Sequence, residues 1–259
     1  MTPSPGDILN WLAAGALFPA MLLPLAGLVR GKLSSAFVFA ALLAGIVGAC
    51  TVFAHLAVDL DPPAFSTGYL LTSAVAAGAL FAACISAGAR GVVAGIAPFV
   101  ETLVRGAGRV TLFLILAMAA IQFTAVILRY VFGLNFIAMQ ESVTYLHGAV
   151  FLLAGGYALL TDDHVRVDIF YREASPKRKA MVDLAGTYLF LVPFCLVALW
   201  AAAPYVANSW AVREGSVEQS GIKGVYILKT LIPIYLTLLL LAGFAAAARA
   251  AETLRPMKG

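Results

Sequence analysis

The sequence predicts an all-α integral membrane protein of about seven transmembrane helices. Of its 259 residues, 62% are hydrophobic and 12% are charged, which is about half the charged fraction of a soluble domain. So few polar side chains cannot cover a water-facing surface, and lipid must surround most of the chain. The apolar stretches are long and uniform, which indicates helices, since membrane strands would be short and alternating.

Seven apolar stretches are long enough to cross a membrane. A helix rises about 1.5 Å per residue, so about 20 residues span about 30 Å of hydrocarbon. The predicted helices are Ile8–Val29, Ser34–Val58, Phe65–Ala89, Val110–Phe132, Ser142–Thr161, Ala180–Ala203 and Val225–Ala248.

Residues 92–104 separate the third and fourth predicted helices. Apolar residues recur there at helical spacing, which is typical of an amphipathic helix on the inner membrane surface. Gly91, Gly95 and Pro98 disfavour a helix, so an ordinary linker fits equally well. Both alternatives place a boundary between a three-helix extension (residues 1–100) and a four-helix domain (residues 101–259).

The distribution of basic residues predicts the orientation, because loops rich in Lys and Arg stay in the cytoplasm. Thirteen of the 17 basic residues fall on one side: Arg30, Lys32, Arg90, Arg105, Arg109, Arg166, Arg172, Lys177, Arg178, Lys179, Arg249, Arg255 and Lys258. The N-terminus is therefore expected outside and the C-terminus in the cytoplasm. Trp11, Trp200 and Trp210 agree, since they fall near the outer helix ends, where an indole prefers to lie.

The predicted membrane centres carry almost no charge, and Gln122 is the clearest polar residue in one. We find neither the relay of Asp, Glu or His that a proton pump needs nor a pair of Gly/Pro-broken helices typical of a substrate site. The three cysteines lie in apolar stretches without metal-ligand spacing. No basic run is long enough to indicate nucleic-acid binding. The chain is therefore predicted to be no enzyme and to hold no metal.

Two helical histidines keep an alternative open. His55 and His147 both lie toward the outer side and could ligate a b-type haem, which would make the chain a subunit of a redox enzyme. A membrane histidine is more often hydrogen-bonded to a neighbouring helix. Elsewhere, Gly155-Gly156 in mid-helix indicates close helix packing, and Lys229 near the outer end of the last helix is expected to snorkel.

Two segments outside the helices are rich in polar residues. In residues 162–171 charges alternate with apolar residues, which suits either an interfacial segment or a solvated loop. The predicted outer loop, residues 204–224, is too long for a tight turn and mixes aromatic residues with both signs of charge. It could dock a partner outside the membrane or be a plain surface loop.

Four short fragments occur in order at the ends of the last four predicted helices. They are Arg129-Tyr130-Val131-Phe132-Gly133 followed by Glu141, then His164-Val165-Arg166-Val167-Asp168-Ile169-Phe170, then Pro204-Tyr205 through Ser209-Trp210, then Glu214-Gly215-Ser216 leading to Gly221-Ile222. With them, residues 105–250 resemble the small membrane subunit (DctQ-like) of tripartite ATP-independent periplasmic (TRAP) transporters. The chain departs from that family in lacking a Trp shortly before Glu141, and residues 1–100 lie outside the resemblance.

The resemblance implies a three-part importer in the bacterial inner membrane. A periplasmic binding protein (DctP-like) captures a solute, typically a carboxylate, and a large membrane subunit (DctM-like) carries it inward with sodium ions. The small subunit supports the large one in the lipid bilayer and helps to present a surface to the binding protein. It has no catalytic residues, no cofactor and no substrate site of its own.

The resemblance and the charges together select candidate interface residues. We expect Arg129 and Glu141 to pair across the outer turn between the fourth and fifth helices, because an unpaired charge near lipid is costly. A second group is expected to anchor the inner end of the fifth helix: His164, Arg166 and Asp168. A third is expected on the periplasmic face: Trp210, Arg213, Glu214 and Glu218.

Overall fold

The computed structural model describes residues 21–28, 89–164 and 171–255, and this part of the chain is helical. Its elements are η2 (Leu23–Gly27), α5 (Arg90–Val131), α6 (Ile137–Thr161), α7 (Pro176–Gly186), the π-helical turn η4 (Thr187–Leu191), α8 (Val192–Ala211) and α9 (Val225–Leu254). Within it, four helices are long and apolar enough to cross a membrane: α5, α6, the continuous helix Pro176–Ala211 and α9. The helical fold class is thus confirmed, and the first three predicted helices lie outside the described residues apart from residues 21–28 and Ala89.

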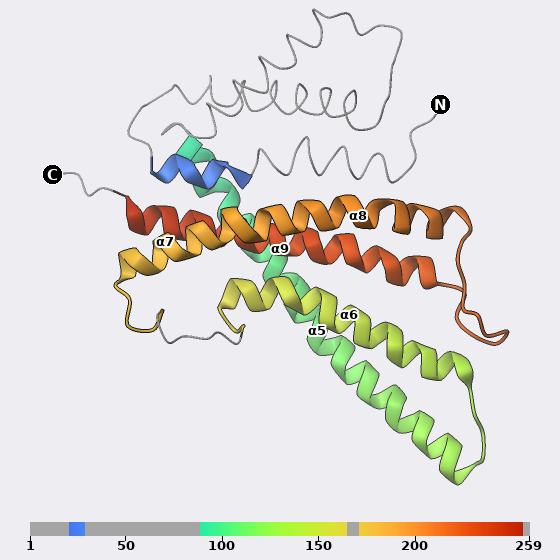
Figure 1. Cartoon of the computed structure of the whole chain (residues 1–259). Coiled ribbons are helices and arrows are strands. Elements are labelled where there is room, and N and C mark those ends of the chain that lie inside the picture. The colour runs from blue at the N-terminus through green and yellow to red at the C-terminus, as the bar shows by residue number, and fades with distance from the viewer. Residues whose placement is uncertain (1–20, 29–88, 165–170, 256–259) are drawn as a thin grey trace, which may run out of the picture.

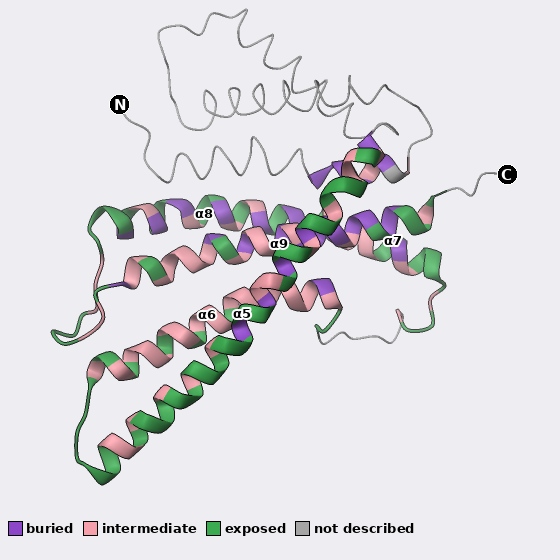
Figure 2. Ribbon diagram, turned by 180° about the vertical axis from the view of Figure 1, so that it is seen from behind, coloured by how far each residue is buried: buried purple, intermediate pink, exposed green. Residues whose placement is uncertain are grey.

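Helix α9 is the centre of the structure (Figure 1). It contacts α5, α6, α7, α8 and η2. In the most apolar 18-residue segment of α9, 56% of the residues are buried, whereas in that of α5 only 6% are buried. Figure 2 shows this contrast between the two helices. Alanines between Ala242 and Ala251 make much of the buried surface of α9, because small side chains let neighbouring helices approach closely.

Helix α5 runs without a break from Arg90 to Val131, over 42 residues. The linker prediction for residues 92–104 is therefore wrong, whereas the helix predicted there is present and continues into the membrane helix. Pro98 is inside the helix, where a proline removes one backbone hydrogen bond. Burial of Val100 and Val104 in the core offsets that loss, so the helix continues.

The sixth predicted helix is also longer than expected, and its bounds need correction. The observed helix spans Pro176–Ala211 and contains Pro204, so the predicted loop 204–224 begins only at residue 212. The buried residues Val206 and Ser209 follow Pro204 in α8 and hold this last part of the helix in place. The π turn Thr187–Leu191 precedes Pro193. Such turns often occur where the regular backbone hydrogen bonding of an α-helix is interrupted.

Two adjacent glycines bring α6 and α9 into contact. A Cβ atom on Gly156 would lie 2.9 Å from the Leu238 carbonyl oxygen and 3.0 Å from its carbonyl carbon. A Cβ on Gly155 would lie 2.5 Å from Tyr235 Cε2. The predicted role of Gly155-Gly156 in close helix packing is confirmed.

The α5–α6 hairpin diverges from the α8–α9 pair toward one end of the molecule (Figure 1). We call this the loop end, because the α5–α6 turn (residues 132–136) and the loop between α8 and α9 (residues 212–224) lie there. Along the diverging part of α5, large apolar side chains are exposed: Leu112, Phe113, Leu116 and Phe123. This surface is suited to lipid or to another membrane protein.

Candidate functional site

At the loop end, a carboxylate near the start of α6 holds the 212–224 loop. Glu141 accepts hydrogen bonds from the Ser216 hydroxyl and from the Ile222 backbone N–H, the latter at 2.6 Å. The loop closes on itself, since the Ser216 N–H donates to the Ile222 carbonyl at 3.1 Å. A Cβ on Gly221 would collide with the Ser216 hydroxyl and lie 2.7 Å from Glu141 Oε1. The loop therefore folds tightly around the Glu141 carboxylate, with room only for glycine at position 221.

A second carboxylate ties the same loop to α9. Glu214 accepts a hydrogen bond from Lys229 Nζ at 2.5 Å. The ammonium group also lies 4.0 Å from the centroid of the Tyr205 ring in α8, close enough for a cation–π contact. The Lys229 side chain is 15% exposed. Lys229 binds Glu214 and so joins α8, the loop and α9.

Trp210 closes the junction between α8 and α9. Its indole N–H donates to Thr230 Oγ1 at 2.8 Å, and its ring meets Tyr226 edge-on at 4.7 Å between centroids. Arg213 and Glu218 are exposed, and Arg213 has a left-handed backbone (φ 46°). The structure therefore divides the predicted group: Trp210 and Glu214 make contacts within the chain, whereas Arg213 and Glu218 face outward.

The predicted ion pair between Arg129 and Glu141 is wrong. Arg129 is exposed at the end of α5, 6.0 Å from the Tyr130 ring centroid. The Glu141 carboxylate instead binds Ser216 and Ile222. Two donors from a loop remote in the sequence satisfy the carboxylate, so it needs no pairing with Arg129.

The Glu214 contact predicts a loop that opens in acid. The hydrogen bond from Lys229 lowers the pKa of Glu214 below its ordinary value of 4.5. A group with a lowered pKa stabilises the folded loop fully above its ordinary pKa, and this contribution is lost as pH falls through the folded-state pKa. Hydrogen exchange of the loop amides, corrected for its intrinsic pH dependence, should therefore accelerate below about pH 4.5. In Lys229→Met the loop should exchange faster already at neutral pH, and an unchanged pH profile in that variant would contradict this role.

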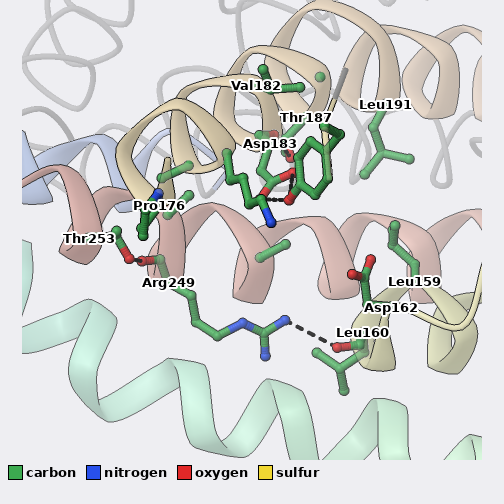
Figure 3. Close-up of a pocket in the computed structure, with 16 residues that line it drawn as sticks. Leu159, Leu160, Asp162, Pro176, Val182, Asp183, Thr187, Leu191, Arg249 and Thr253 are labelled. Atoms are coloured by element: carbon green, nitrogen blue, oxygen red, sulfur yellow. Dashed lines mark hydrogen bonds between the residues drawn. The ribbon is translucent and has the colours of Figure 1, made fainter. Parts of the chain in front are cut away.

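At the opposite end, Arg249 of α9 joins three helices. It donates to Glu101 of α5 at 2.9 Å. It also donates to the Leu160 carbonyl at the end of α6 at 3.2 Å (Figure 3). A helix leaves its last carbonyls without partners, so the guanidinium caps α6 as well as pairing with α5. The sequence suggested no such role for Arg249, because neither partner is near it in the chain.

Beside Arg249, a pocket of about 820 Å³ lies between the end of α6, α7 and α9 (Figure 3). Its polar wall is bonded internally: the Tyr171 hydroxyl donates to the Asp183 carboxylate at 2.9 Å, and Lys179 lies 5.3 Å from the Tyr171 ring centroid. His164 is exposed near this pocket's end of α6. Arg166 and Asp168, predicted to act with it, lie outside the described residues.

The described residues contain no group of three His, Cys, Asp or Glu side chains that could hold a metal ion. His147 is exposed on α6, and His55 lies outside the described residues. No observation on the described part of the chain supports a haem site.

Comparison with models of protein families matches residues 118–253 to the DctQ component of tripartite ATP-independent periplasmic transporters. The chain belongs to the DctQ family. No curated protein and no solved structure matches it.

Membership of the DctQ family makes this chain a small subunit of a TRAP transporter and a multi-pass membrane protein. The match covers both carboxylates that hold the loop, Glu141 and Glu214. Two fragments that are far apart in the sequence meet in one cluster, because Glu141 of the first binds Ser216 and Ile222 of the fourth.

Proposed function

We propose that this DctQ-family chain is the non-catalytic supporting subunit of a sodium-coupled importer of a small organic solute, with a carboxylate as the expected class. Its partners are a large DctM-like membrane subunit and a DctP-like periplasmic binding protein, in the bacterial inner membrane. The family match carries this proposal. The contacts agree with it, because the Lys229–Glu214 pair joins α9 to the loop and the Arg249–Glu101 pair joins α9 to α5.

We further propose that the loop end faces the periplasm. Within the described residues, the opposite end carries Arg90, Arg105, Arg109, Arg172 and the run 177–179, whereas the loop end carries fewer basic residues. The positive-inside rule supports this orientation. A reagent that reaches a cysteine introduced at position 214 only from the cytoplasm would reverse it.

The 212–224 loop is our candidate for the surface that meets the binding protein. Two carboxylates fix its backbone, so docking would not have to order the loop. Its outward residues combine both signs of charge with an apolar tip: Arg213, Glu218 and Lys223 are exposed and Val217 is fully exposed. Residues 1–100 form the proposed extension beyond the family domain, with α5 running through its boundary.

Affinity purification of the tagged chain in mild detergent tests the proposal. A large polytopic membrane protein should co-purify in stoichiometric amount, and mass spectrometry would identify it. A visible spectrum of the same sample should lack haem absorption. A chain that purifies alone and binds solute or haem would overturn the proposed function.

A further inference from the structure

Gln122 lies in the apolar part of α5. Its side chain is exposed, and within the described part of the chain it makes no hydrogen bond. From Arg109 to Arg129, α5 rises about 30 Å at about 1.5 Å per residue, which matches the hydrocarbon thickness. Gln122 is then about 20 Å from Arg109 and about 10 Å from Arg129 along the axis, so its amide lies within the hydrocarbon.

An amide in lipid without a hydrogen-bond partner is costly, because no water is present to bind it. Thr124, two residues away and also exposed, avoids this cost: its hydroxyl donates to the Ala120 carbonyl at 2.8 Å in the same helix. Among the described residues, Gln122 makes no such hydrogen bond within α5. We therefore expect its amide to hydrogen-bond a polar group on another helix.

The residues around Gln122 have the spacing of a helix–helix seam. Ile115, Ala119, Gln122, Val126 and Arg129 follow intervals of four and three residues, and all are exposed. This pattern lines one face of a helix that packs against a second helix. Ala119 next to Gln122 is small, which lets a second backbone approach closely.

The contacts among the described residues leave the seam uncovered. The neighbouring stripe of α5, Met118, Ile121 and Ala125, is half-buried, so α5–α6 packing uses a different face. The described N-terminal residues 21–28 meet α5 at its other end, where Arg90 Nε donates to the Ala26 carbonyl at 2.9 Å. That contact is about 48 Å along the helix from Gln122.

We propose that the seam Ile115–Arg129 of α5 receives a transmembrane helix of the large partner subunit, and that this helix supplies a hydrogen-bonding group to Gln122. The inference rests on the proposed function, since it requires a second membrane subunit. A polar contact of this kind orients two helices in lipid, where apolar surface alone does not distinguish a partner from acyl chains.

Substitution of Gln122 should weaken the complex without affecting the chain itself. Gln122→Leu is expected to reduce association with the large subunit about 3- to 30-fold, the range measured for hydrogen bonds between membrane helices. Thr124→Val is the matched control, because it removes a polar atom that is bonded within α5. It should leave association unchanged. Equal effects of the two variants would overturn the role of Gln122.

Photo-crosslinking in native membranes tests the partner directly. Benzoylphenylalanine is placed at position 122 or, as control, at position 120, which is exposed on the opposite side of α5 at nearly the same depth. The full-length chain is expressed with the large subunit, and cross-linked peptides are identified by mass spectrometry. Position 122 should cross-link to a transmembrane helix of the large subunit, and position 120 should not.

The outcomes separate this inference from the proposed function. If the large subunit co-purifies but position 122 cross-links to residues 1–88, to a second copy or to nothing, the seam proposal fails while the proposed function stands. If no large subunit co-purifies, the proposed function fails and the seam loses its occupant.

Discussion

Gly156→Ala is expected to destabilise the packing of α6 on α9 by about 1–3 kcal/mol, the usual cost of overpacking a close contact. The added methyl group would lie 2.9 Å from the Leu238 carbonyl oxygen and 3.0 Å from its carbon. These are backbone atoms of the central helix, which cannot move as a flexible side chain can. Unfolding of the purified chain in mixed micelles of increasing denaturing detergent measures the loss.

Gly106→Ala is the matched control for this change. A Cβ on Gly106 has no neighbouring atom within 4 Å, and an alanine in a helix is favoured over glycine by roughly 0.5–1 kcal/mol. The control should therefore be neutral or stabilising. Equal destabilisation by both variants would show that glycine is needed in these helices for a reason other than the contact with Leu238.

Glu141→Ala is expected to release the 212–224 loop. The substitution removes the acceptor of the Ser216 hydroxyl and of the Ile222 N–H. Hydrogen bonds to a charged group are the stronger ones in proteins, so the Ile222 amide should exchange with solvent roughly tenfold faster or more. Hydrogen–deuterium exchange of the peptide containing Ile222 measures this, and association with the proposed binding protein should weaken in parallel.

Two further comparisons isolate the cause. Arg129→Ala should leave the loop unchanged, because Arg129 does not touch Glu141 in the structure; faster exchange in this variant would restore the ion-pair hypothesis. Gly221→Ala should open the loop as Glu141→Ala does. Gly215→Ala should leave the loop closed. The nearest atom to its Cβ would be Lys223 Cα at 3.4 Å, which is an ordinary van der Waals contact.

Several features of this protein follow from the sequence alone, because they depend on local composition. The long apolar stretches predict helices in lipid, and four of the seven predicted helices correspond to apolar helices in the described residues. The position of Gly155-Gly156 in the middle of an apolar helix predicted close packing, and the contacts with Tyr235 and Leu238 confirm it. The order of the fragments predicted the DctQ family, and the family match confirms this as well.

The tertiary structure alone decided where the helices end and which charges meet. Pro98 and Pro204 resemble helix breakers in the sequence, but burial of their neighbours against the core keeps α5 and α8 continuous. Glu141 binds residues 75 and 81 positions away, and Arg249 binds Glu101 across 148 positions. A charge pairs with the donor that folding brings within about 3 Å, and sequence proximity, which suggested Arg129 for Glu141, does not determine that distance.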